Sequence, residues 1–248
     1  MKDYTVELSG EFHADLEWWK WALCQRHILE GVSLYASFYE HIEWPPVRHW
    51  LSDATPNAIG GFCWESRVWW RYDLSVDEQQ RSSAHTTCAS HNKLSINLLE
   101  LLAMVVTAYV MVVVKEDRPS VAGEPVLMRG DSSSAVSWVN RCGGTRDPRA
   151  AFIMRWLGAL EVNTGWCFES SHIPGSSNVL ADGITRWDRA DIPQKLTELS
   201  LPSDIPWQEA SLGVSGGKAC SAILRPFSQA SELRRRLTRL MPQIGKCG

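Results

Sequence analysis

The sequence predicts an α/β fold in which a mixed five-stranded sheet is flanked by helices. Between residues 47 and 74, three short segments (VRHWLSDA, GGFCWES and RVWWRYDL) are rich in aromatic residues, with Gly60-Gly61 and Glu65-Ser66 as turn residues. This pattern indicates three consecutive antiparallel strands. Two later segments, 124–131 and 165–173, are each preceded by a helical segment. We therefore expect them to join the sheet through helical crossovers, as parallel strands.

Two helices and one loop are predicted before the fourth strand. Apolar residues at helical spacing between 11 and 30 indicate an amphipathic helix. The apolar run of residues 94–114 predicts a long helix packed on the sheet. Residues 75–93 are polar and rich in Ser, Thr and Gln, which predicts a loop or a peripheral insertion.

Three further helices are predicted after that strand. Residues 132–141 predict a short helix directly behind it. Asp147 and Pro148 are a favourable N-cap and first helical residue for a longer helix, which continues to Gly165. The segment 178–187 predicts the last helix, which follows a Pro-Gly loop.

The composition is that of an ordinary globular protein. The chain has 248 residues, 44% of them apolar and 21% charged, which excludes disordered and fibrous classes. The longest apolar run contains Glu100 and is shorter than a bilayer span, and the N-terminus lacks an apolar signal segment. The seven cysteines show no zinc-type spacing. We expect an intracellular protein, in cytoplasm or nucleus, with reduced thiols and no membrane partner.

One domain with two appendages is predicted. Residues 1–46 would form a helical connection segment, residues 47–190 the domain, and residues 191–248 a flexible tail rich in Pro, Gly and Ser. The net charge is −3, but residues 205–248 hold seven Lys and Arg against two Glu, which leaves −8 for the rest. The tail is therefore basic, and the alternative interpretations of it are a nucleic-acid-binding arm or an unrelated read-through.

Four acids are candidate metal ligands. Asp53 ends the first predicted strand, Asp131 ends the fourth, and Glu100 lies in the long apolar helix, where an unpaired buried charge would be costly. Asp182 lies four residues after Asn178, a candidate N-cap, with its side chain directed towards the strand ends. Hard carboxylate oxygens are what two-metal phosphodiester cleavage needs, and clustered acids would have raised pKa values without metal.

Each of these residues also has a simpler interpretation. Asp53 could be a turn residue, Asp131 a helix cap and Asp182 a partner of the helix dipole. His172, in the loop before the last helix, could shuttle protons or assist product release, or be an ordinary exposed histidine.

Four motifs together resemble the ribonuclease H domain of reverse-transcribing elements. They are SDATPNAIGGF, INLLELLA, RGDSSSAVSWVN and HIPGSSNVLADGITR, and the resemblance covers residues 47 to 187. The preceding HADLEWWKWAL and EGVSLY resemble the connection that joins reverse transcriptase to ribonuclease H in DIRS-like or Ngaro-like retrotransposons. No polymerase YxDD motif is present, so the chain looks like the C-terminal piece of a pol polyprotein or a genomic remnant.

This resemblance implies a ribonuclease H-like sheet and hydrolysis of the RNA strand in RNA/DNA hybrids, leaving a 3′-hydroxyl and a 5′-phosphate. It implies two Mg²⁺ or Mn²⁺ ions, held by Asp53, Glu100, Asp131 and Asp182, with His172 as an additional catalytic group. The hybrid and the polymerase part of the polyprotein are the implied partners. Candidate hybrid contacts are Arg129, Ser132, Ser133, Asn140 and Asn178, although the region between Asp131 and Asp182 carries only scattered Arg.

Two alternatives remain open. The first is a non-catalytic remnant, or a domesticated nucleic-acid- or protein-binding module, that keeps the fold. The second is an enzyme with another substrate, because integrases, resolvases and some exonucleases share this fold and metal chemistry.

Overall fold

A six-stranded mixed sheet forms the centre of the protein in the computed structural model, which describes residues 10–24, 48–83, 92–114, 125–141 and 147–225. The strands are β1 (Arg48–Ala54), β2 (Ala58–Cys63), β3 (Val68–Asp73), β4 (Pro125–Gly130), β5 (Cys167–His172) and β6 (Gln208–Glu209). Their order in the sheet is β5-β4-β1-β2-β3-β6.

The pairing directions confirm the predicted mixed sheet. β1, β2 and β3 pair antiparallel, whereas β4 is parallel to β1 and β5 is parallel to β4. β6 is an additional edge strand that pairs parallel to β3. The sequence did not predict it because two residues are too short to show a periodic pattern.

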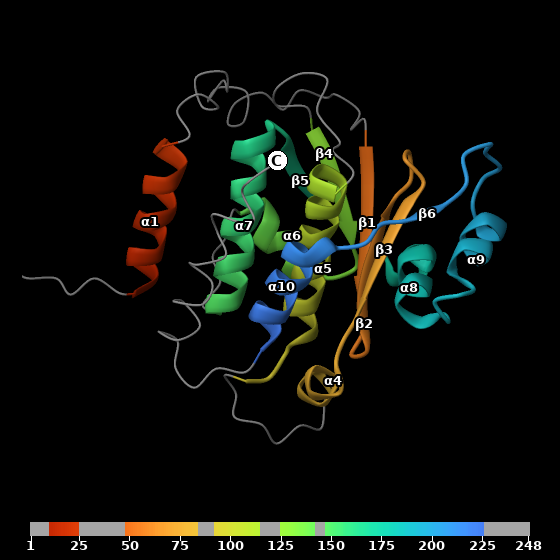
Figure 1. Cartoon of the computed structure of the whole chain (residues 1–248), viewed down its shortest axis with the longest axis horizontal. Coiled ribbons are helices and arrows are strands. Elements are labelled where there is room, and N and C mark those ends of the chain that lie inside the picture. Colours follow the sequence, from red (N-terminus) through yellow and green to blue (C-terminus); the bar gives the residue numbers. More distant parts are fainter. Residues whose placement is uncertain (1–9, 25–47, 84–91, 115–124, 142–146, 226–248) are drawn as a thin grey trace, which may run out of the picture.

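Helices cover both faces of the sheet (Figure 1). One face carries α5 (Ile96–Tyr109), which continues as a π-helix over Val110–Val114, with α6 (Ser133–Asn140), α7 (Pro148–Thr164) and α10 (Gly213–Leu224). The other face carries α8 (Val179–Arg186) and α9 (Ile192–Leu199). The protein is thus built of three layers, helix on sheet on helix.

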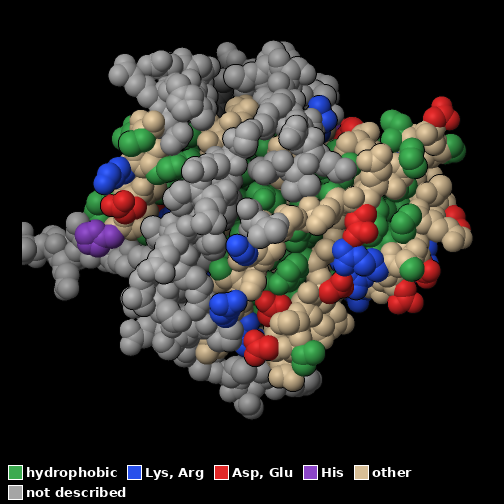
Figure 2. All heavy atoms as spheres, in the orientation of Figure 1, with side chains coloured by type: hydrophobic (Ala, Val, Ile, Leu, Met, Phe, Trp, Pro, Cys, Tyr) green, Lys and Arg blue, Asp and Glu red, His purple; other side chains and the backbone are tan. Residues whose placement is uncertain are grey.

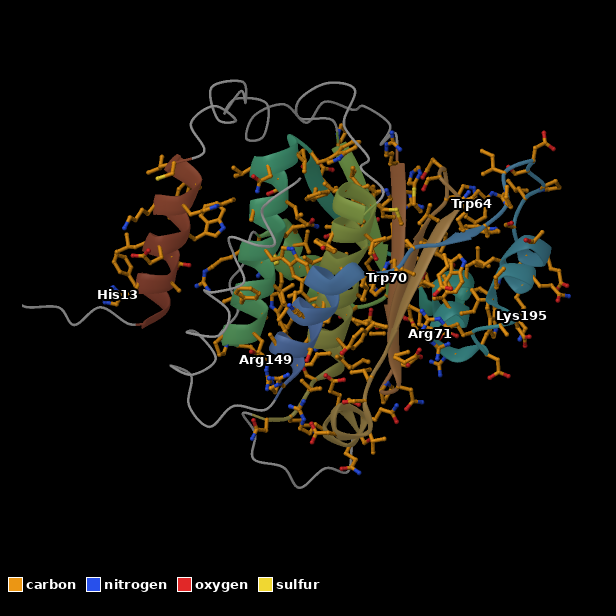
Figure 3. All side chains as sticks on the ribbon, in the orientation of Figure 1. His13, Trp64, Trp70, Arg71, Arg149 and Lys195 are labelled. Carbon is orange, nitrogen blue, oxygen red and sulfur yellow. The ribbon has the colours of Figure 1, made fainter. Side chains whose placement is uncertain are left out.

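Helix α5 is the central element of the core. All residues from Leu98 to Val112 are buried, because the helix lies between the sheet, α6, α7 and α10. This explains why its sequence is apolar on every side. Trp70 of β3 packs on this side of the sheet (Figure 3) and donates a hydrogen bond from Nε1 to Thr107 Oγ1 at 3.0 Å. In the described part of the chain, no helix has both the length and the apolar character needed to cross a bilayer.

The predicted boundaries of α7 are confirmed. Asp147 Oδ1 accepts a hydrogen bond from the Arg149 backbone N–H at 2.8 Å, and Pro148 occupies the first turn. Gly165 ends the helix with a φ of 76°, in the left-handed region that glycine adopts without strain.

Gly60 and Gly61 lie in the middle of β2, so their predicted role as turn residues is wrong. A Cβ on Gly60 would come within 2.7 Å of Ile184 in α8, and one on Gly61 within 2.3 Å of Thr107 in α5. The two glycines therefore let helices approach the same strand closely from opposite faces. Glycine inside a strand often marks such a close approach.

The segment 75–93 contains a helix where a loop or an insertion was expected. This helix is α4 (Val76–Ser82). Ser75 and Glu78 form a reciprocal capping box at its N-terminus. The buried guanidinium of Arg81 donates to the backbone oxygen of Leu224 and pairs with Asp77, so this polar helix is tied to the core by hydrogen bonds rather than by an apolar face.

The structure differs from the expected tail between residues 192 and 224. This segment forms α9, β6 and α10, and it buries Trp207, Leu212, Ile223 and Leu224 against the domain. A sequence rich in Pro, Gly and Ser here joins short elements that pack on an existing core. The remainder of the predicted tail, residues 226–248, lies outside the described residues.

Helix α1 (Gly10–Cys24) packs on α7. Trp18 Nε1 donates to the backbone oxygen of Arg155 at 3.0 Å, and Asp15 pairs with the Arg155 guanidinium at 2.8 Å. The predicted helix over 11–30 is thus present as far as Cys24, and residues 25–47 of the connection segment lie outside the described part of the chain.

We expect Gly61→Ala to destabilise the protein by about 1 to 3 kcal/mol, because the added methyl group would collide with Thr107 and with the backbone oxygen of Leu51. Chemical denaturation would measure the loss. Gly217→Ala is the matched control, because a Cβ there meets nothing within 4 Å and alanine favours the helix. Equal stability of the two variants would contradict the close approach of α5 to β2.

Candidate metal centre

Three carboxylates from separate segments converge at one edge of the sheet. Asp53, Glu100 and Asp131 each offer an oxygen, and the three oxygens all lie within 4.8 Å of one another. Asp53 and Glu100 are buried, whereas Asp131 is partly exposed, so the cluster opens to solvent on one side.

The pairing of β1 with β4 explains how two of these acids meet. The strands run parallel with Leu51 opposite Arg129. Asp53 lies two residues after Leu51, and Asp131 lies two residues after Arg129. Because the carboxyl ends of neighbouring parallel strands lie at the same edge, the two acids emerge side by side.

Glu100 reaches the cluster from the second turn of α5. Its Oε1 accepts a hydrogen bond from the backbone N–H of Ala54 at 3.1 Å, which ties the helix to the end of β1. Its Oε2 is buried and accepts no hydrogen bond from any described residue, and the side chain as a whole is only 4% exposed. A buried carboxylate oxygen without a partner is costly and is stabilised by a proton or a cation.

The electrostatics of the cluster also favour a bound proton or cation. Burial raises the pKa of Glu100 to about 9, with further contributions from the charges of Asp53 and Asp131. Burial also raises the pKa of Asp53 to about 6, against the opposing effect of a hydrogen bond from Thr185. Neighbouring carboxylates that repel one another are suited to a divalent cation, and hard oxygen donors are those that Mg²⁺ and Mn²⁺ prefer.

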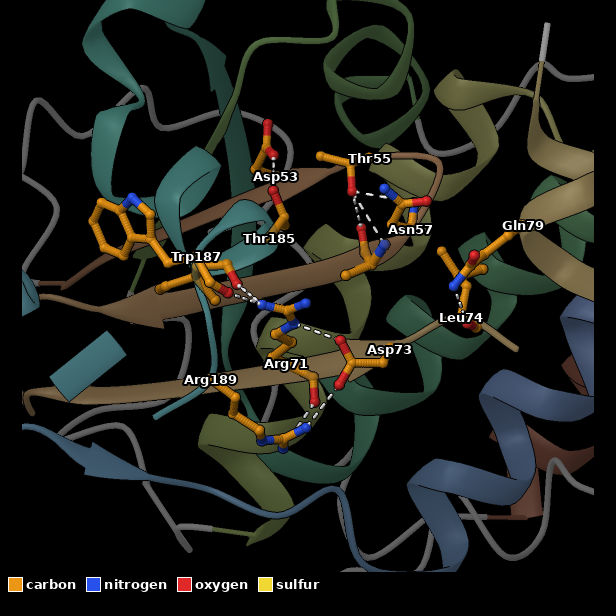
Figure 4. Close-up of polar contacts among 12 residues, drawn as sticks. Asp53, Thr55, Asn57, Arg71, Asp73, Leu74, Gln79, Thr185, Trp187 and Arg189 are labelled. Carbon is orange, nitrogen blue, oxygen red and sulfur yellow. Dashed lines mark hydrogen bonds and ion pairs between the residues drawn. The ribbon is translucent and has the colours of Figure 1, made fainter. Parts of the chain in front are cut away.

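Helix α8 supports the cluster from the other face of the sheet. The Thr185 hydroxyl lies 2.8 Å from Asp53 Oδ2, to which it donates (Figure 4), and also 2.8 Å from the backbone oxygen of Asp182. Asn178 Nδ2 donates to the backbone oxygen of Ser52 at 2.9 Å. Sequence reasoning missed Thr185, whose only signal is a hydroxyl three residues after Asp182 on the same helical face.

Asp182, the expected fourth ligand, does not belong to the three-acid cluster. Its Oδ1 pairs with Arg186 Nε at 2.6 Å, and both side chains are substantially exposed. It nevertheless lies close enough for its charge to raise the pKa of both Asp53 and Glu100. The structure thus places Asp182 beside the cluster, paired with a cation from its own helix.

His172 lies at the exposed end of β5, next to the cluster. Its Nε2 is 3.0 Å from the backbone oxygen of Asp131. The short 3-10 helix Gly175–Ser177 follows, and a Cβ on Gly175 would come within 3.0 Å of Asp131 Oδ2. The loop after β5 therefore passes directly over Asp131.

Three of the five residues expected to contact a hybrid make hydrogen bonds within the fold. Asn140 exchanges hydrogen bonds with the backbone of Ser170 in β5 at 2.9 Å. Asn178 occupies the N-cap position of α8 without capping it, because its amide is bound to β1. Ser132 caps α6 and donates to Asn97 Oδ1 at 3.2 Å.

The other two of these five residues lie closer to the solvent. Ser133 is exposed at the start of α6, two residues after Asp131. Arg129 is half-buried on β4, two residues before Asp131. Both flank the cluster along the chain.

We expect the stability of the metal-free protein to fall as the pH rises. Glu100 has an ordinary pKa of 4.5 and a folded pKa of about 9. The folded state therefore binds the extra proton between these values. Its contribution to stability is complete below pH 4.5 and is lost towards pH 9, at up to about 1.4 kcal/mol per pH unit. Denaturation between pH 5 and 9 in chelator would measure this slope, and Glu100→Gln should flatten it. An unchanged slope in that variant would contradict the assignment.

We expect Thr185→Val to raise the pKa of Asp53 further, because the hydroxyl that stabilises its ionised form is removed. Carboxyl NMR titration of the metal-free protein would measure the change. Thr185→Ser keeps a hydroxyl and should leave the pKa close to that of the parent. If both variants behave alike, the hydrogen bond does not control Asp53.

Comparisons with protein-family models, curated proteins and solved structures found no match to this chain. What this site does is therefore inferred from the side chains that form it.

Proposed function

We propose that the protein is a metal-dependent endonuclease of the ribonuclease H type, which hydrolyses the RNA strand of RNA/DNA hybrids within a retrotransposon reverse transcriptase. The observation that carries this proposal is the convergence of Asp53, Glu100 and Asp131 within 4.8 Å at the edge of a mixed sheet. The three acids lie within motifs that resemble those of the ribonuclease H domain.

A purely structural role explains this cluster poorly. Structural acids are usually paired with a cation or saturated by hydrogen bonds. Here Glu100 Oε2 has no hydrogen-bond partner among the described residues, and the pKa values of Asp53 and Glu100 are both raised. Perturbed acids gathered in one place are typical of functional sites.

The residues present fit a pair of Mg²⁺ or Mn²⁺ ions. Asp53, Glu100 and Asp131 would hold them, and Asp182 would complete the set from α8. Such ions, when bound, supply the Lewis acidity that activates water and stabilises the leaving 3′ oxygen. Thr185 holds one oxygen of Asp53 in place, and the backbone N–H of Ala54 holds one oxygen of Glu100. The other oxygen of each carboxylate is left for coordination.

His172 would move protons at the rim of the site. Its imidazole is exposed, and its Nε2 lies at the backbone of Asp131. Histidine is the side chain that most often acts as a general acid or base. We assign it to proton transfer or product release rather than to metal binding.

The substrate would be recognised by its shape and its 2′-hydroxyl groups rather than by its base sequence. Arg129 and Ser133 are the candidate contacts that remain open to such a role. On the face drawn in Figure 2, basic side chains lie next to acidic ones and form no extended basic surface among the described residues. Residues 226–248 contain five Lys and Arg against one Glu, so this segment or a polymerase partner would supply the counter-charge for the hybrid.

We expect Asp131→Asn to abolish cleavage of a hybrid in Mg²⁺, because the variant loses a metal-binding charge. The loss should be at least about a hundredfold. Gel analysis of a hybrid labelled on the RNA strand would measure it, with chelator and an all-DNA duplex as negative controls.

The matched control is Asp188→Asn, which neutralises an exposed acid outside the cluster and should cut like the parent. If Asp131→Asn also cuts like the parent, the site is wrong. If the parent binds hybrid and metal yet never cuts, the chain is a binding module with this fold. Cleavage of all-DNA duplexes alone would favour a related nuclease with another substrate.

A further inference from the structure

Arg186 pairs with the acid that stands outside the three-carboxylate cluster. Its Nε lies 2.6 Å from Asp182 Oδ1, and the two residues are four positions apart on α8. The side chains of Arg186 and Asp182 are 63% and 41% exposed. The ion pair is therefore open to water, and exposed pairs of this kind are weak and readily broken.

Arg186 is also part of the electrostatic environment of the cluster. The hydrogen bond to Asp182 and the charges of Asp182, Asp53 and Asp131 raise the pKa of its guanidinium, against a smaller effect of burial. Conversely, the charge of Arg186 lowers the pKa of Asp53. The guanidinium is thus a cation that already occupies the neighbourhood of the acids.

We propose that Arg186 competes with the second metal ion for Asp182, so that an ion can use this carboxylate only after the guanidinium has been displaced. The inference rests on the proposed metal centre. Two observations carry it. Asp182 is held in an ion pair beside the cluster, and Glu100 Oε2 is a buried oxygen in the cluster without a hydrogen-bond partner among the described residues.

The physical basis is competition between two cations for one carboxylate. An ion that binds Asp53, Glu100 and Asp131 meets three carboxylates whose oxygens lie within 4.8 Å of one another. An ion that also needs Asp182 must break the ion pair and approach a positive guanidinium. The first ion should therefore bind more tightly than the second, and Arg186 should set the difference.

The experiment counts bound Mn²⁺ on the full chain by electron paramagnetic resonance, with calorimetry for the affinities. We expect the parent to bind one ion tightly and a second ion weakly. Arg186→Gln should tighten the second site about tenfold, because the ion no longer has to displace the guanidinium from Asp182. Asp182→Asn should lose the second ion and keep the first.

The matched control is Arg189→Gln. Arg189 is likewise an exposed arginine, and its partners Asp73 (Figure 4) and Glu209 lie outside the cluster. This variant should bind Mn²⁺ like the parent. The double variant Arg186→Gln, Asp182→Asn is the sharpest test, because competition for Asp182 predicts that the effect of Arg186→Gln disappears when Asp182 is already neutral.

The possible results separate this inference from the proposed function. If the first ion binds but Arg186→Gln leaves the second site unchanged, the role of Arg186 is wrong and the metal centre stands. A tightening that persists in the double variant would also overturn the competition, because it would show a general repulsion. If the parent binds no ion at Asp53, Glu100 and Asp131, the metal centre is wrong and the inference fails with it.

Discussion

The hydrogen bond between Glu100 and the backbone of Ala54 is the contact on which the site depends. It joins the central helix α5 to the end of the central strand β1, and it places a carboxylate where the sheet, the helix and the loop after β4 meet. Because α5 is buried from Leu98 onwards and Glu100 is only 4% exposed, this carboxylate has little contact with solvent. The charge must therefore be met inside the protein, by a proton or by a cation, and Asp53 and Asp131 create the conditions for a cation.

The two faces of the sheet contribute differently to this edge. On one face, the apolar packing of α5 holds the Glu100 side chain in a buried position. On the other, α8 provides polar support through Asn178 and Thr185, which bind the end of β1 at Ser52 and Asp53. The glycine pair in β2 makes both approaches possible, because neither helix meets a side chain at Gly60 or Gly61. The arrangement holds Asp53 from one side and Glu100 from the other.

Much of the fold could be predicted because its elements have local signals. The aromatic-rich segments of β1 to β3, the apolar length of α5, and the Asp147, Pro148 and Gly165 boundaries of α7 are all visible in neighbouring residues. The errors fall where stability comes from distant contacts. Helix α4 is held by Arg81 reaching the end of α10, and β6 exists only because β3 offers a free edge. Neither contact leaves a periodic pattern in the sequence.

The sequence by itself determined which acids are available and where they lie along the chain: at the ends of two strands, within one apolar helix and at the start of another. The tertiary structure decided which of them meet. Parallel pairing of β1 with β4 brings Asp53 and Asp131 to one edge, and the packing of α5 adds Glu100. Asp182 pairs with Arg186 because residues four apart on a helix are neighbours. The distance of Asp182 from the other three acids depends instead on how α8 packs against the sheet. Spacing along a chain encodes local geometry only, and convergence between segments is set by packing.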